Sequence, residues 1–461
     1  MMSHIADDLG KLTPKQRAML EQRLKEKQSR PPLPAKSDDE NLVLASSVDS
    51  VDALLAKFYG RFPWPWEAIK FDYVEDAEFE REMLHQDIGD WGHQRLGPRP
   101  QVWVGGCGTN QAIQTALRFR GGGVIGSDVS AKSLEICRRN AEALGLGNLE
   151  LREESINLAE YEGRFDYVIS TGVIHHNADP EATLGKLARG LKPGGVLELM
   201  VYNRYHRLVT SSFQKAVRIF GENKEALDFE AELALAKRII SNIPAKDLLE
   251  RAFIQYMDYA ESDLADLLIQ PVEHSYTVES LEEMAARCGL ELIAPCISLY
   301  AKSLATYLWN LSFADEELQE QYHALPDSRR WQITNLLLHE KSPLLWFYFQ
   351  RADGGRPRKS EHQICAEFLD TRFVRTAAFQ RSYLRSEDGH YGLSSSRVPY
   401  PLAAPHPLLR QVYEAVAPEK TMGEVLDGLG IRRGFGEVNR MRIMLTTSAF
   451  PYLKALPQEP L

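Results

Sequence analysis

Cysteine is scarce in this chain of 461 residues and follows no ligand or disulfide pattern. There are five cysteines, and no two of them form a CxxC pair. Disulfide-stapled domains are much richer in cysteine, and structural zinc sites bring their cysteines close together in sequence. The sequence therefore excludes a disulfide scaffold and predicts no metal site. We expect reduced, mostly buried thiols in a cytoplasmic protein.

Long apolar runs and an excess of positive charge are also missing. No stretch reaches the roughly 18 apolar residues that a membrane-spanning helix needs, and the first residues, MMSHIADDLGK, lack the apolar centre of a signal peptide. Lys and Arg number 54 against 64 Asp and Glu, which gives a formal charge of −10. Since proteins that coat nucleic acids depend on basic surface, we expect neither a membrane nor a nucleic acid as partner.

The composition is that of a soluble globular protein, with 44% hydrophobic and 26% charged residues. The segment Leu12–Lys27 predicts a short helix, and the proline-rich, charged segment Ser29–Glu40 is typical of a linker. We therefore expect three parts: a helix with its linker (residues 1–36), a large domain (37–351) and a smaller accessory domain (352–461). The first helix is either a frayed leader or an interaction helix.

Five aromatic residues lie close together between residues 58 and 66, interleaved with Pro63 and Pro65. Prolines at this density end a helix and bend the chain. The rings could simply be core residues. They could also form a wall over a small-molecule site, because ligand pockets favour aromatic side chains.

Residues 101 to 201 alternate between predicted strands and helices. Strands are expected at Val102–Val104, in VIGSD ending at Asp128, in NLELREES, at Phe165–His176 and in VLELMVYN. Ser130 is the expected cap of the helix after the second strand, and Pro193-Gly194-Gly195 closes the helix before the fifth. Such alternation predicts an α/β fold with a doubly wound, mostly parallel sheet.

The first turn of this unit has the features of a nucleotide-binding turn. Gly106 and Gly108 let a ligand approach the backbone closely, and Asp128 follows 20 residues later, where a carboxylate can accept both hydroxyls of a ribose. A dinucleotide fold would need a third glycine in GxGxxG, but Asn110 and Gln111 stand there. The other ligand class that suits this arrangement is S-adenosylmethionine.

The motifs GGCGTNQAIQTALRF, VIGSDVS, FDYVISTGVIHHNADP and LKPGGVLELMVY closely resemble class I S-adenosylmethionine-dependent methyltransferases, in particular those with GCGTG and GVLHHxxDP. The resemblance spans about a hundred residues. It implies a Rossmann-like, seven-stranded sheet with S-adenosylmethionine over the carboxyl ends of the first strands. It assigns cofactor binding to Gly106, Cys107, Gly108, Asn110, Asp128, Val129, Ser155, Ile156, Thr171 and Gly172.

Three positions depart from the family pattern. Val104 stands two positions before the glycine turn, where the family often has an acidic residue. Asn110 replaces a usual glycine, so it must adopt a tight conformation or let the helix start differently. Ser155 stands where the family usually has an acidic residue that contacts the adenine amino group. The departures at Asn110 and Ser155 keep open a scaffold that binds S-adenosylmethionine without transferring its methyl group.

Several polar residues are candidates for the acceptor side of the site. A hydroxyl acceptor benefits from a general base, and the catalytic candidates are His176, His175, Tyr202 and His206. The residues between 203 and 275 form a helical insertion over the substrate, and LLWFYF (Leu344–Phe349) is the expected seventh strand.

The leading hypothesis is transfer of a methyl group to oxygen or nitrogen of a small or carrier-bound metabolite in bacterial secondary metabolism. The helix at Leu12–Lys27 resembles the one that opens modules of nonribosomal peptide synthetases, which suggests a nonribosomal peptide synthetase or polyketide synthase as partner. The accessory domain resembles helical or winged-helix-like domains of some bacterial methyltransferases, including those acting on protein lysines, and is a candidate for homodimer formation. The alternatives are a protein lysine methyltransferase and a transferase or cyclase that uses the aminoalkyl chain of S-adenosylmethionine.

Overall fold

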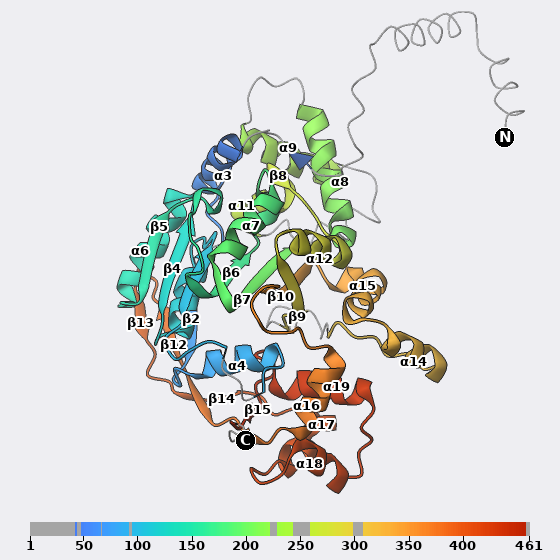
Figure 1. Cartoon of the computed structure of the whole chain (residues 1–461). Helices are drawn as coiled ribbons and strands as arrows, with labels where there is room; N and C mark the ends of the chain where they lie inside the picture. The colour runs from blue at the N-terminus through green and yellow to red at the C-terminus, as the bar shows by residue number, and fades with distance from the viewer. Residues whose placement is uncertain are drawn as a thin grey trace, which may run out of the picture. The chain divides into compact units, whose positions relative to one another are not determined.

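The computed structural model (Figure 1) describes residues 42–43, 48–65, 67–91, 95–221, 228–242, 259–297 and 308–457. The chain divides into two compact units between Asn41 and Leu42. The predicted helix at Leu12–Lys27, and with it the proposed docking role of residues 1–36, lies outside the described residues. All the elements described below belong to the second unit.

A seven-stranded sheet forms the centre of this unit. Its strands run in the order β5-β4-β3-β6-β7-β10-β9. The neighbouring pairs among the first five strands are parallel, and β10 is antiparallel to both β7 and β9. This confirms the predicted doubly wound α/β fold, including the seventh strand. The strands are β3 (Gln101–Gly105), β4 (Gly123–Asp128), β5 (Leu149–Glu153), β6 (Phe165–Thr171), β7 (Leu191–Tyr202), β9 (Leu290–Pro295) and β10 (Leu344–Arg351).

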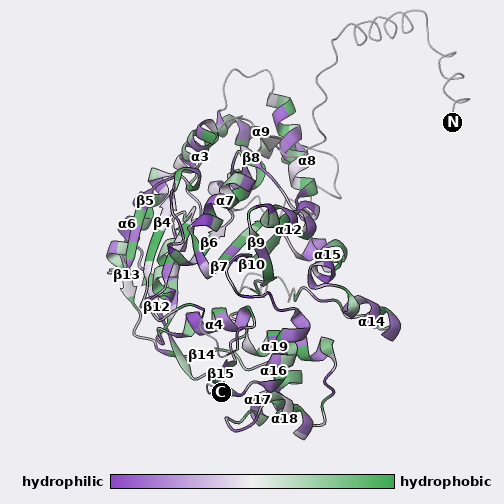
Figure 2. Cartoon of the chain, viewed as in Figure 1, coloured by the Kyte–Doolittle hydropathy of each residue, from purple (hydrophilic) through white to green (hydrophobic). Residues whose placement is uncertain are grey.

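Both faces of the sheet are buried, because neighbouring residues along each strand point into opposite cores. Val102 and Val104 belong to the core under helices α5 (Gln111–Arg118) and α6 (Ala131–Ala143). Trp103 points the other way, toward the core under α7 (Pro180–Gly190), α12 (Val278–Arg287) and α15 (Asp327–Leu337). Figure 2 shows hydrophobic residues along the central strands and hydrophilic ones on outer helices such as α14 (Glu316–Ala324).

Local signals in the sequence explain where several helices begin. The Ser130 hydroxyl accepts a hydrogen bond from the Ser133 amide at 3.2 Å and caps α6, as predicted. Asp179 caps α7 in the same way, accepting from the Ala182 amide, and Pro180 occupies the first turn. These caps fix where each helix leaves the carboxyl edge of the sheet.

Two predicted boundaries were wrong. The fourth strand ends at Thr171 rather than His176, because Gly172 has φ 78° and turns the chain into a short 3-10 helix, Ile174–His176. The next helix ends at Gly190, and the predicted closing turn Pro193-Gly194-Gly195 lies within β7. The first correction moves the two histidines off the sheet and onto a loop at its edge.

The inserted segments cover the carboxyl edge of the sheet. They comprise α8 (Arg204–Gly221), α9 (Phe229–Asn242) and α11 (Glu261–Leu268). Apolar side chains of these helices pack with α3 (Val48–Arg61) in one core cluster. The short strands β1 (Leu42–Val43) and β8 (Val272–Glu273) pair beside them. A helical insertion was predicted here.

The sequence pattern from Asn41 to about Pro98 predicts helix, but the structure has strand β2 (Lys70–Val74) before helix α4 (Phe79–Asp87). β2 pairs antiparallel with β12 (Ala378–Arg385), more than 300 residues later. A partner this distant leaves no trace in the local sequence pattern.

The C-terminal part mixes helices and antiparallel strands and is not a separate unit. Its elements are α16 (Glu361–Asp370), β11 (Phe373–Arg375), β13 (Tyr391–Leu393), β14 (Val398–Tyr400), α17 (Pro407–Ala415), α18 (Met422–Gly428), α19 (Phe435–Thr446) and β15 (Leu453–Ala455). Trp91 packs against Phe368 and Phe373, with ring centroids 5.7 Å away in each case. The expected boundary at residue 352 therefore does not separate two compact units, because β12 and this core join it to residues 70–91.

Candidate active site

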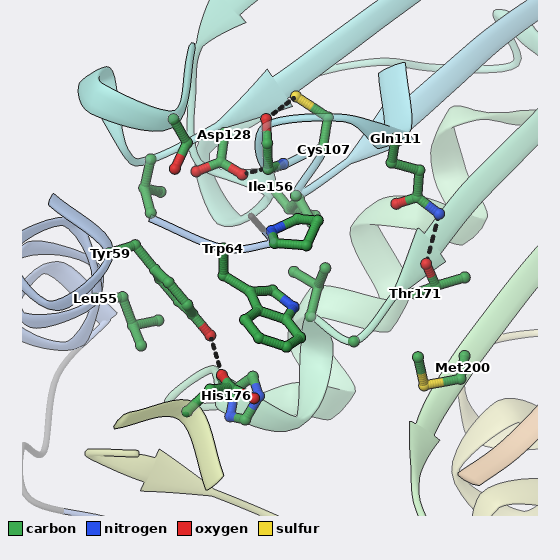
Figure 3. Close-up of a pocket in the computed structure, with 18 of the residues that line it drawn as sticks. Leu55, Tyr59, Trp64, Cys107, Gln111, Asp128, Ile156, Thr171, His176 and Met200 are labelled. Carbon is green, nitrogen blue, oxygen red and sulfur yellow. Dashed lines mark hydrogen bonds between the residues drawn. The ribbon is translucent and has the colours of Figure 1, made fainter. Parts of the chain in front are cut away.

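A cavity of about 590 Å³ opens at the carboxyl ends of β3, β4, β6 and β7. In doubly wound sheets ligands bind at this edge. All ten residues that the sequence assigned to cofactor binding line this one cavity. Figure 3 shows Cys107 and Asp128 at one end of it, Tyr59 and His176 toward the other, and Trp64 between them.

The turn after β3 needs glycine for two separate reasons. Gly106 and Gly108 have φ of 73° and 54°, the left-handed region that other residues rarely adopt. A Cβ on Gly108 would also lie 2.6 Å from the carbonyl oxygen of Trp64. The Thr109 hydroxyl donates to the Pro65 carbonyl at 2.6 Å. The segment at residues 64–65 is therefore held directly against the glycine turn.

Asp128 is fixed by the backbone around it. One carboxylate oxygen accepts from the Gly108 amide and the other from the Ser130 amide, both at 2.8 Å. Burial raises the pKa of Asp128, and the backbone hydrogen bonds act against that rise. The carboxylate is thus oriented before any ligand arrives, at the tip of β4, where the family resemblance places the ribose hydroxyls.

Two of the departures from the family pattern, Asn110 and Ser155, have local explanations. Asn110 has φ −130° and is the N-cap position of α5, so the helix starts after it and no left-handed residue is needed. The Ser155 hydroxyl accepts from the Asn157 amide at 3.1 Å and caps the 3-10 turn Ile156–Leu158. Glu154 also lines the cavity and supplies a carboxylate one position before Ser155.

Residues from α5, β6 and β7 line one side of the cavity. The Gln111 amide donates to the Thr171 hydroxyl at 2.5 Å, and Met200 follows on the neighbouring strand. Figure 3 shows Gln111, Thr171 and Met200 on the same side of the cavity. Sequence reasoning named Thr171 but missed Gln111 and Met200, which lie within the quoted motifs at positions to which the resemblance assigned no role.

Two of the four predicted catalytic residues line the cavity, His176 and Tyr202. The His176 Nδ1 atom lies 2.8 Å from the Val272 carbonyl oxygen. Because a carbonyl only accepts, Nδ1 carries the proton and Nε2 is free of one. Burial lowers the pKa of His176, which favours this neutral form.

The other two, His175 and His206, do not line it and need correction. His175 is fully buried, its ring 4.0 Å from that of Tyr202, and within the described part of the chain neither ring nitrogen has a hydrogen-bond partner. Burial holds its pKa well below 6.5. His206 lies on α8 outside the cavity, and burial lowers its pKa to about 4.

A polar cluster that the sequence did not reveal stands at the far end of the cavity. Asp266 on α11 accepts hydrogen bonds from the hydroxyls of Tyr59 and Tyr202, each at 3.2 Å. Gln270 donates to the Tyr59 hydroxyl at 2.6 Å. Tyr59 and Asp266 are 207 positions apart, so only the fold brings them together.

Both interpretations of the aromatic cluster apply, to different rings. Phe58 and Phe62 are buried core residues, while Tyr59 and Trp64 line the cavity. Trp66 lies outside the described residues. Trp346 of β10 lines the cavity as well, with its indole N–H donating to Glu198 at 2.9 Å. The aromatic residues of the cavity therefore come from segments near the beginning and near the end of residues 37–351.

Comparison with known proteins identifies the central segment. Residues 105–240 match a family model described as "Methyltransferase domain". Residues 105–240 are thus similar to a methyltransferase domain. It is 34% identical over 139 residues to a ubiquinone biosynthesis O-methyltransferase of Cereibacter sphaeroides, which covers 29% of this chain and 52% of that protein. It is also 23% identical over 299 residues to an uncharacterized protein of a Synechococcus strain, covering 64% of this chain and 70% of the relative. The chain spans only about half the length of the named methyltransferase.

One solved structure has a similar fold over most of this chain. PKMT2 from Rickettsia typhi, in complex with AdoHcy, has a TM-score of 0.52 at 14% identity and covers 83% of this chain and 76% of its own. The family match and this fold make S-adenosylmethionine the cofactor of the cavity. The residues fit it, since Gly106 and Gly108 present backbone without a side chain to the cavity and Asp128 presents an oriented carboxylate.

Two kinds of feature are absent from the described ranges. No group of three or more His, Cys, Asp or Glu side chains there could hold a metal ion. Over the same ranges, no helix is long and apolar enough to cross a bilayer.

Proposed function

We propose that this protein transfers the methyl group of S-adenosylmethionine to oxygen or nitrogen of a small or carrier-bound metabolite, in bacterial secondary metabolism. The observation that carries the proposal is the continuity of the cavity. It runs from the glycine turn and Asp128 to the cluster of Tyr59, Tyr202 and Asp266. One end thus suits the cofactor, and the other offers aromatic and polar groups to a second molecule.

The cofactor supplies an electrophilic methyl group, and the chain's own residues must orient the acceptor and exclude water. Trp64 and Pro65 cover the glycine turn, and α11 covers the acceptor end. Holding two reactants in line is worth several orders of magnitude in rate. His176, with an unprotonated Nε2, and Asp266 are the groups at this end that can receive a proton.

Product analysis tests this proposal against its alternatives. The protein is incubated with methyl-labelled S-adenosylmethionine and a dialysed extract or, separately, the small-molecule fraction of the cells that make it. We expect label in a small molecule and S-adenosylhomocysteine as the by-product, both lost in Asp128→Ala. Label in protein would favour a protein methyltransferase, methylthioadenosine would indicate aminoalkyl chemistry, and no turnover despite cofactor binding would indicate a scaffold.

A further inference from the structure

The cavity is lined by acidic side chains without a basic counterpart. Among the described lining residues the carboxylates are Asp52, Asp128, Glu154 and Asp266, and none of the lining residues is Lys or Arg. The first three have partners near the cofactor end: Asn157 for Asp52, backbone amides for Asp128 and the Tyr161 hydroxyl for Glu154. Asp266 stands apart from them, on α11 at the acceptor end.

Asp266 is buried, at 9% exposure, and among the described residues no Lys or Arg forms an ion pair with it. Arg207 is the nearby cation, and its guanidinium lies 4.1 Å from the centre of the Tyr202 ring. Arg207 is already paired with Glu273, whose carboxylate accepts from the guanidinium Nε at 2.8 Å. His176 is neutral. Asp266, Glu273 and Arg207 together therefore carry one net negative charge.

A buried charge without a counterion is costly, and it becomes favourable when a cation binds beside it. Tyr59 and Tyr202 donate their hydroxyls to Asp266 and hold its carboxylate at the cavity. Trp64 and Trp346 line the same space, and aromatic rings attract cations through their faces. Carboxylate and aromatic rings together form a site for an organic cation.

Resting on the proposed function, we propose that the methyl acceptor is an amine, which enters as an ammonium ion and is recognised by Asp266 between Tyr59 and Tyr202. The ammonium gives one proton to the Asp266 carboxylate and becomes a neutral amine. The nitrogen lone pair then forms the new N–CH₃ bond while the sulfur–methyl bond breaks, and S-adenosylhomocysteine leaves as a neutral sulfide. The product is a methylated ammonium ion, and Asp266 returns its proton to water.

This charge pattern separates amines from other acceptors. During the transfer, positive charge moves from sulfur to the acceptor nitrogen, and the aromatic side chains that line the cavity stabilise it there. A carboxylate or phenolate acceptor would bring a second negative charge beside Asp266 and be repelled. Burial raises the pKa of Asp266, which makes it a better proton acceptor for an ammonium ion.

Binding of a matched ligand set tests the proposal without relying on turnover. Benzylamine, benzyl alcohol and benzoate are titrated at pH 8 into the full chain, with and without S-adenosylhomocysteine, and followed by calorimetry and tryptophan fluorescence. We expect benzylamine to bind at least 10-fold more tightly than the other two. Asp266→Asn should remove this preference, because the isosteric amide keeps the size but not the charge.

Asp263→Asn is the matched control, since it makes the same change on the same helix at a residue outside the cavity. It should keep the preference for the amine, and thermal unfolding should show that both variants are folded. Equal binding of the three ligands, no binding of benzylamine, or an unchanged preference in Asp266→Asn would each overturn the proposal. S-adenosylhomocysteine binding in the same samples separates this failure from failure of the proposed function, which would show as loss of that binding in the wild type.

Discussion

Replacing Gly108 by alanine tests the contact between the Trp64–Pro65 segment and the glycine turn. The new Cβ would lie 2.6 Å from the Trp64 carbonyl oxygen, a backbone atom that no side-chain rotation can move away. Gly108 also has φ 54°. Gly145 is a matched control, because it has φ 66° but no atom within 4 Å of the place that an alanine methyl group would occupy.

The two substitutions share one cost and differ in the other. A left-handed backbone destabilises a protein by roughly 1–2 kcal/mol when the residue is not glycine. Gly145→Ala should lower the free energy of unfolding by this amount alone. Gly108→Ala should lose about 1–3 kcal/mol in addition, the typical cost of overpacking. Urea unfolding measures both losses, and calorimetric titration measures the affinity for S-adenosylhomocysteine.

We expect Gly145→Ala to bind S-adenosylhomocysteine as the wild type does. Gly108→Ala should bind it at least 10-fold more weakly, since the covering segment must move off the turn. Equal losses of stability in the two variants, together with unchanged affinity in Gly108→Ala, would refute the reasoning.

Two buried groups and the connection between the two ends of the chain support three further predictions. Burial lowers the pKa of His85 to about 4. The folded protein therefore binds fewer protons than the unfolded chain between pH 4 and 6.5. The free energy of unfolding should fall by up to about 3 kcal/mol as the pH drops through this window. Urea unfolding across pH should show a shallower acid limb in His85→Gln, and an unchanged limb would contradict the assignment. Glu273→Gln leaves Arg207 buried without its charged partner and should lower the free energy of unfolding in urea by about 3 kcal/mol or more. A decrease below about 1 kcal/mol, typical of surface ion pairs, would argue against a buried pair. A chain ending at residue 351 lacks β12, the partner of β2, and should fail to fold cooperatively, while the full chain should show one calorimetric transition for residues 42–461; two separate transitions would contradict the single unit.

Local motifs explain how much of the cofactor site could be predicted from the sequence. Gly106, Gly108 and Asp128 lie within one strand-turn-helix-strand unit, so their spacing alone places them at one edge of the sheet. The cap at Ser130 was predictable for the same reason, because a helix start depends on its immediate neighbours. The alternation of strands and helices then determined the sheet.

The acceptor end could be predicted only in part. Tyr202, His176 and the aromatic cluster that contains Tyr59 were candidates, but Asp266 and Trp346 come from distant segments and lie in no pattern that distinguishes them from core residues. His175 and His176 are adjacent, yet only His176 lines the cavity, because the 3-10 turn after Gly172 points their rings differently. Strand β2 was missed because its partner β12 lies far along the chain, and pairing of this kind depends on tertiary contacts.

Calorimetric titration with S-adenosylhomocysteine tests the central claim, that this cavity holds the adenosyl cofactor, most directly. We predict one equivalent bound by the wild type and at least 10-fold weaker binding by Asp128→Ala, whose Gly108 and Ser130 amides lose their acceptor. No binding to the folded wild type, or equal affinity in Asp128→Ala, would contradict the account.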